Sequence, residues 1–129
     1  MSTAQVVDSS GWLEYFTDGK SAAFFAPAIE KSDRLLVPVI TIYEVCKKVL
    51  RERGENAALQ IASMMQIGRV IDLDSSLALD AARYPLPLAD SLIYATVLRF
   101  GATLWTQDEH FKGLAHVRYS PKRSSAPKA

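Results

Sequence analysis

Five short runs rich in β-branched residues and leucine limit what this chain can fold into more than any other feature. They lie at 5–8, 34–37, 69–73, 102–105 and 117–119, the last as a short edge strand. Most of the intervals between them are long enough for one or two helices. Parallel strands need such helical crossovers, which then cover both faces of the sheet. We therefore expect an α/β fold, a three-layer α/β/α sandwich with a central parallel sheet.

The intervals between the runs carry apolar residues at helical spacing. The expected helices are a segment around Trp12 and Phe16 capped by Ser9 or Ser10, then 22–30, 39–54, 55–67, 74–84 and 88–100, with a further turn at 107–111. Pro27 is expected to start or interrupt the second helix, because proline lacks the N–H that a helix interior needs. In the helix over 55–67 we expect the inward face to carry Leu59, Ala62, Met65 and Ile67.

Length and composition are those of one globular domain. The 129 residues are 49% hydrophobic and 22% charged, and none of the apolar runs approaches the roughly 20 residues that cross a bilayer. The start lacks the features of a signal peptide. The single cysteine, Cys46, excludes an internal disulfide and a cysteine-based zinc site, so we expect a reducing, cytoplasmic location and no membrane.

The C-terminal stretch differs from the rest of the chain. The domain is expected to cover 1–119 and a basic, flexible tail 120–129; the last twelve residues contain no acid and carry Arg118, Lys122, Arg123 and Lys128. A solvated terminus is the simpler interpretation. The alternative is an arm that contacts phosphates.

Four acidic residues are candidates for one edge of the sheet. Asp8 ends the first run, Asp108 follows the fourth, Asp90 lies in the first turn of the helix over 88–100, and Glu44 lies on the apolar side of the helix after the second run. Ligands of open α/β sheets bind outside the carboxyl ends of the strands. Each acid also has a structural alternative. Asp8 and Asp108 could cap helices, Asp90 could interact favourably with the dipole at a helix N-terminus, and Glu44 could face solvent.

Carboxylates that converge without partners repel one another, and a cation removes the repulsion. Mg²⁺ and Mn²⁺ prefer such oxygen ligands, and metal-activated water is suited to phosphodiester hydrolysis. No activated serine or cysteine is then required. We interpret His110 and His116 as structural or exposed, because neither has metal-ligand spacing, and Cys46 as a small core residue.

Three motifs in this order resemble the PIN-domain family: VVDSSGWL at 6–13, VITIYEV at 39–45 and LPLADSLIYATVLRFGATLWTQDEHF at 86–111. The resemblance covers the chain from Val6 to about Tyr119 and is greatest to VapC-like toxins of toxin–antitoxin pairs. Tyr94 stands where many relatives carry a small residue, and the tail lies outside the family core.

The resemblance implies a nuclease that cleaves RNA with one or two Mg²⁺ or Mn²⁺ ions. The family's acidic positions fall on Asp8, Glu44, Asp90 and Asp108, which would be the catalytic metal ligands, with Ser9 and Thr106 in supporting positions. It also implies a homodimer and a small antitoxin whose C-terminal segment blocks the site.

Other functions fit less well. A PIN-domain nuclease of RNA maturation or decay, working without an antitoxin, is the main alternative. A receiver-like signalling domain needs paired acids after the first strand, yet Asp8 is followed by Ser9 and Ser10, which also excludes a D-x-D phosphatase motif. A PIN domain that has lost activity and only binds is disfavoured because all four acids are present.

Overall fold

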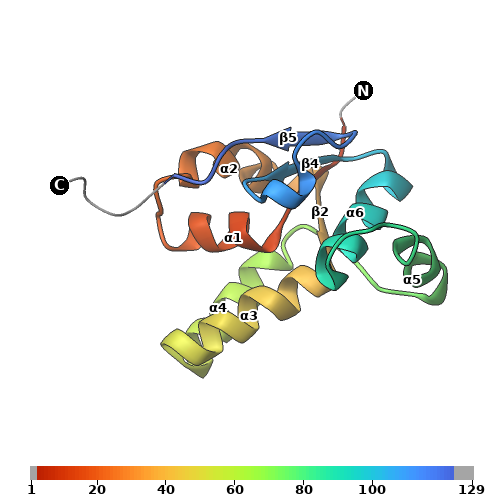
Figure 1. Ribbon diagram of the computed structural model, residues 1–129. Helices are drawn as coiled ribbons and strands as arrows, with labels where there is room; N and C mark the ends of the chain where they lie inside the picture. Colours follow the sequence, from red (N-terminus) through yellow and green to blue (C-terminus); the bar gives the residue numbers. More distant parts are fainter. Residues whose placement is uncertain (1–2, 124–129) are drawn as a thin grey trace.

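The computed structural model describes residues 3–123, so Lys128 and the rest of 124–129 in the predicted tail lie outside the described residues. Helices alternate with short strands along the chain (Figure 1). The elements, including two 3₁₀ turns, are β1 (Gln5–Val7), α1 (Ser9–Phe16), α2 (Ala22–Glu30), η1 (Ser32–Arg34), β2 (Leu35–Pro38), α3 (Val39–Arg53), α4 (Glu55–Met65), β3 (Arg69–Ile71), α5 (Ser75–Ala81), α6 (Leu88–Phe100), β4 (Thr103–Thr106), η2 (Glu109–Phe111) and β5 (Val117–Tyr119).

The five strands form one parallel sheet, as the sequence predicts, and the structure shows that their order is β3-β2-β1-β4-β5. The chain runs outward from β1 to β3 on one side and then returns to the other side of β1 for β4. The strand order therefore reverses beside β1, and β1 pairs with β4 in the register Val7↔Trp105. A reversal of this kind opens a crevice at the carboxyl ends of the two strands, which is where α/β sheets bind ligands.

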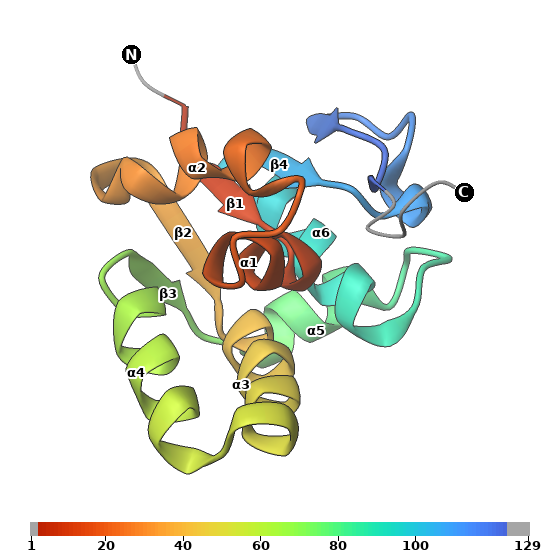
Figure 2. The same cartoon turned by 90° about the vertical axis from the view of Figure 1, so that its left-hand side faces the viewer.

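Alternating side chains along each strand form the two halves of the core. Val7 and Trp105 belong to the cluster that packs under α1, α2, α3 and α4, whereas their neighbours Val6 and Leu104 belong to the cluster that packs against α6. Figure 2 shows α1 in front of the sheet and α6 behind it. This two-fold periodicity explains why the strands are continuously apolar: both faces are buried. The expected three-layer α/β/α architecture is confirmed.

Two details of the helices differ from the prediction. Pro27 lies inside α2, and the helix continues through it rather than starting or breaking there. Leu59 of α4 and Ile67, two residues after the end of α4, were expected to face the core but are 60% and 70% exposed. Met65 is completely buried, as expected, and Ala62 is half-buried, whereas Ala58 lies in the core where Leu59 was expected, on the side of α4 that packs against α3. Among the described residues, none of the helices is both long and apolar enough to span a membrane.

Gly11 sets the distance between α1 and the sheet. A Cβ atom at this position would lie 2.6 Å from the Phe25 ring and 2.7 Å from Cγ1 of Val7, both of which are completely buried. Neither neighbour is the free end of a flexible chain. The missing side chain therefore lets α1 approach β1 and α2 closely enough to place its first turn over the crevice.

Gly11→Ala should consequently destabilise the protein by overpacking, at a cost of about 1–3 kcal/mol in the free energy of unfolding. Urea titration followed by circular dichroism would measure it. Gly101→Ala is the comparison, since Gly101 has φ of 58° but open space around its Cα, and it should cost only about 1–2 kcal/mol of backbone strain. An unchanged midpoint for Gly11→Ala would contradict the close approach.

Candidate active site

Asp8 follows β1 and caps α1, so the same carboxylate belongs to the strand end and to the helix start. One oxygen, Oδ1, accepts hydrogen bonds from the backbone N–H of Gly11 at 2.9 Å and from Ser10 Oγ at 3.2 Å. The other, Oδ2, accepts from Thr106 Oγ1 at 2.5 Å. The capping interaction is the usual role of aspartate at this position. The side chain is thereby fixed at the crevice between β1 and β4.

Burial makes the charge of Asp8 costly. Asp8 is 3% exposed, and burial raises the pKa of its carboxyl from 3.8 to about 6, although the hydrogen bonds from Thr106, Gly11 and Ser10 act in the opposite direction. The Asp108 carboxylate adds a smaller increase. A buried carboxylate held in this way favours a nearby positive charge.

Glu44 reaches the same region from the second turn of α3. The sequence left open whether Glu44 faces solvent or lies among apolar side chains. The residue is half-buried, which is between these two alternatives. Ser9 Oγ donates a hydrogen bond of 2.5 Å to its Oε1 atom. The hydroxyl of α1 therefore orients the carboxylate of α3 across the site.

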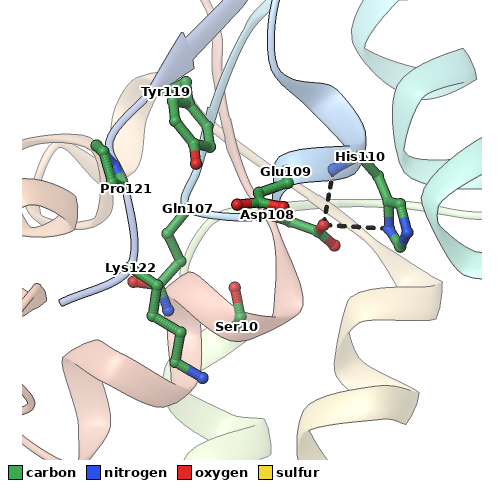
Figure 3. Close-up of a pocket in the computed structure, with 8 residues that line it drawn as sticks. All are labelled: Ser10, Gln107, Asp108, Glu109, His110, Tyr119, Pro121 and Lys122. Carbon is green, nitrogen blue, oxygen red and sulfur yellow. Dashed lines mark hydrogen bonds and ion pairs between the residues drawn. The ribbon is translucent and has the colours of Figure 1, made fainter. Parts of the chain in front are cut away.

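Asp90 and Asp108 meet at His110. The imidazole Nδ1 lies 2.9 Å from Oδ2 of Asp90 and 3.1 Å from Oδ1 of Asp108. The same Oδ1 atom also accepts a hydrogen bond from the backbone N–H of His110, and Figure 3 shows both interactions between Asp108 and His110. Asp108 is the cap of η2, and its own N–H donates to Thr106 Oγ1 at 2.9 Å. Burial and then the Asp108 charge raise the pKa of Asp90, while Asp108 and then Asp90 raise the pKa of His110.

All four predicted acids line one cavity of about 280 Å³, together with Ser9, Ser10 and Leu13. The structure thus brings Asp8, Glu44, Asp90 and Asp108 to the carboxyl edge of the sheet, with Thr106 behind Asp8. The tightest cluster of possible metal ligands among the described residues is Asp90, Asp108 and His110, whose ligand atoms lie within 4.8 Å of one another. Asp8 and Glu44 line the same cavity but are outside that cluster.

The sequence interpretation missed His110. It is exposed, as expected, but it also contacts two of the acids, and an isolated histidine gave no metal-ligand spacing to reveal this. The usable signal was its position two residues after Asp108, because an aspartate cap directs the following turn back toward its own side chain.

The model of the PIN domain family matches residues 6–117, almost the whole domain. This chain belongs to the PIN-domain family. The family expected from the ordered motifs is confirmed, and no curated protein sequence matches the chain.

Solved structures share this PIN fold. A toxin–antitoxin complex from Klebsiella pneumoniae superimposes with a TM-score of 0.74 and 19% identity over 89% of this chain and 96% of that one. VapC20 of Mycobacterium tuberculosis, described as a sarcin-ricin loop cleaving toxin, gives 0.71 and 20% over 89% and 99%. PAE2754 of Pyrobaculum aerophilum gives 0.61 and 22% over 90% and 81%. At these identities the likeness establishes the fold.

The donor set of this PIN domain fits a hard divalent cation. Its side chains offer carboxylate oxygens with one imidazole nitrogen, and no thiolate lines the cavity. Asp8 is buried without a cationic side chain bonded to it among residues 3–123. Oxygen-rich sites of this kind suit Mg²⁺ or Mn²⁺.

Asp8 should make the stability of the metal-free protein depend on pH. Because its pKa in the folded protein lies near 6, above the ordinary 3.8, the protonated carboxyl stabilises the fold below pH 4, and this contribution disappears as the pH rises through 6. In EDTA, the free energy of unfolding of the wild type should fall by roughly 2–3 kcal/mol relative to that of Asp8→Asn when the pH is raised from 4 to 7. Urea titrations at several pH values would measure the difference, and parallel curves would refute it.

Proposed function

We propose that this chain is a Mg²⁺- or Mn²⁺-dependent endoribonuclease that hydrolyses RNA phosphodiester bonds. The observation that carries the proposal is the meeting of Asp8, Glu44, Asp90 and Asp108 in one cavity at the carboxyl edge of the sheet. These side chains come from the junction of β1 and α1, from α3, from α6 and from the β4–η2 connection. A collection of like charges from four separate elements is unfavourable for folding unless it serves a bound cation.

The roles of the chain's own residues follow from their contacts. Asp8, Glu44, Asp90 and Asp108 would hold the cation, with His110 beside the last two. When bound, a divalent cation supplies Lewis-acid polarisation of the phosphate and lowers the pKa of a water molecule. Thr106 and Ser9 keep the carboxylates of Asp8 and Glu44 oriented through their hydroxyl hydrogen bonds. His110 balances the charge of Asp90 and Asp108 when it is protonated.

We further propose that the nuclease is the toxin of a type II toxin–antitoxin pair. Support comes from its structural neighbours, which include a toxin–antitoxin complex and a toxin named for cleaving the sarcin-ricin loop. Its protein partner would be a small antitoxin and its substrate would be RNA. It would form a homodimer and act in the cytoplasm. Coexpression with a small protein encoded beside it tests the pairing: stable copurification supports a toxin, whereas activity unchanged by that protein favours an antitoxin-independent nuclease of RNA maturation or decay.

Purified protein should cleave RNA with Mg²⁺ or Mn²⁺ and stop in EDTA, measured on total cellular RNA by gel electrophoresis. Asp90→Asn keeps the side-chain size but removes one ligand charge, and should lower the cleavage rate roughly 100-fold or more. Asp33→Asn, an exposed aspartate in η1 at the opposite edge of the sheet, is the matched control and should retain activity.

Equal cleavage by wild type and Asp90→Asn would identify a contaminating ribonuclease. Absence of cleavage by wild type across metals and RNA preparations would count against the nuclease.

Metal binding should be visible without catalysis. A cation that binds only the folded site adds about 2.7 kcal/mol of stability at roughly 100 times its Kd, so Mn²⁺ or Mg²⁺ should raise the melting temperature of wild type by several degrees. Scanning calorimetry at pH 7 is the measurement. Asp33→Asn should respond like wild type and Asp90→Asn much less. Identical shifts in all three proteins would place the metal elsewhere.

A further inference from the structure

A second cavity of about 590 Å³ adjoins the acid cluster and is not used by the proposed chemistry. It is lined by Ser10, Gln107, Asp108, Glu109, His110, Tyr119, Pro121 and Lys122 (Figure 3). Ser10 and Asp108 also line the cavity of the four acids. The two cavities are therefore neighbours with a shared wall, and a ligand in the second would extend toward the acids.

The chain after β5 forms one side of this cavity. Thr106 of β4 is paired with Tyr119 of β5, and the N–H of Ser120 donates to the carbonyl of Thr106 at 3.0 Å. This pairing carries the start of the predicted basic tail alongside the end of β4. Lys122, two residues later, is consequently placed opposite Gln107 and Ser10.

Gln107 is the unusual residue of the cavity. The residue is 5% exposed, and its amide oxygen is buried without a hydrogen-bond partner among residues 3–123. Figure 3 shows it extending toward Ser10 and Lys122, away from the pair formed by Asp108 and His110. Buried polar atoms in folded proteins are normally paired, so an unpaired amide oxygen at a cavity wall points to a ligand that donates to it.

The remaining wall indicates what kind of ligand this is. Gln107 offers the donor and acceptor of an amide, which can pair with a base edge. Tyr119 offers an aromatic ring, and unstacked RNA bases commonly pack on such rings. Lys122 offers a cation for a phosphate. Asp108 and Glu109 lie across the cavity from Lys122 and would repel a phosphate (Figure 3). The phosphate of a bound nucleotide would therefore lie on the Lys122 side, which fixes the direction of the RNA strand in the cavity.

We propose that this cavity binds one unpaired nucleotide of the RNA substrate beside the phosphodiester bond that the acid cluster cleaves. Gln107 hydrogen-bonds to the base edge, and Lys122 pairs with the backbone phosphate. Gln107 is therefore a residue that determines base preference, and Lys122 is a binding residue. The inference rests on the proposed ribonuclease function, but its test does not depend on cleavage.

Binding is measured on the full chain in EDTA, where cleavage is not expected, by fluorescence anisotropy of labelled A₅, C₅ and U₅ RNA. Lys122→Ala should weaken all three about equally and reduce the slope of log K against log salt by about 0.7, the value for one lost phosphate contact on a single strand. Lys31→Ala, an exposed lysine between α2 and η1 at the opposite edge of the sheet from both cavities, is the control of equal charge. An identical salt slope in the two variants would overturn the role of Lys122.

Gln107→Met separates recognition from structure. The substitution keeps the length of the side chain and removes the unpaired oxygen, so the melting temperature of the free protein should rise. If Gln107 instead stabilised the fold, its replacement would lower the melting temperature. The ratio between the highest and the lowest affinity for A₅, C₅ and U₅ should fall by about fivefold or more. Gln60→Met, on the exposed side of α4, should change neither property.

The results distinguish this proposal from the proposed function. If RNA binding keeps its base preference in Gln107→Met, the nucleotide site is refuted even if the wild type cleaves RNA. If the preference disappears and the salt slope falls while metal-dependent cleavage is absent, the nucleotide site is supported and the nuclease is refuted.

Discussion

The hydroxyl of Thr106 is the interaction on which the geometry of the site depends. It donates to the carboxylate of Asp8 and accepts from the backbone N–H of Asp108, so a single oxygen joins the end of β1 to the turn after β4. The register of the two strands makes this possible, because Val7 is opposite Trp105 and the next residues on each strand are Asp8 and Thr106. A shift of one residue would direct Thr106 to the other face of the sheet and separate the two acids.

Capping and metal binding are compatible roles for the same aspartates. Asp8 caps α1 and Asp108 caps η2, so the structural alternatives considered for both residues are true. Each cap fixes one carboxylate oxygen through a backbone N–H, which limits rotation of the side chain. An acid that must hold a cation gains from being held in advance, since less conformational freedom is lost on binding. The capping hydrogen bonds thus orient the carboxylates of Asp8 and Asp108 and leave part of their capacity to bind a cation free.

Most of the fold could be predicted because its signals are local. Strand runs such as 34–37 and caps such as Gly101 are visible in a few consecutive residues, and the order of the acids follows from where strands end. Met65 of α4 is buried as predicted, but the exposure of Leu59 could not be predicted in this way. Leu59 and Ala58 are both compatible with a helix, and only the packing against α3 decides that the alanine is buried.

The family motifs predicted the placement of the acids and of the supporting hydroxyls of Ser9 and Thr106, whereas the surroundings of His110 and Gln107 were not predictable. The contact of His110 with Asp90 joins residues 20 positions apart and depends on the direction of a turn and on a side-chain rotamer. The unpaired oxygen of Gln107 depends on the path of the chain after β5, which no nearby residue specifies. Both are tertiary properties of residues that are unremarkable in sequence.

Three consecutive residues, Thr106, Gln107 and Asp108, connect recognition to chemistry. Successive side chains at the end of a strand point in different directions: Thr106 contacts Asp8, Gln107 lines the neighbouring cavity, and Asp108 contacts His110. A change in the side chain of Gln107 alters the cavity wall without removing a contact to any of the four acids. The base preference of such a site can therefore vary while the ligand set is kept, whereas a change at Thr106 disturbs both acids at once.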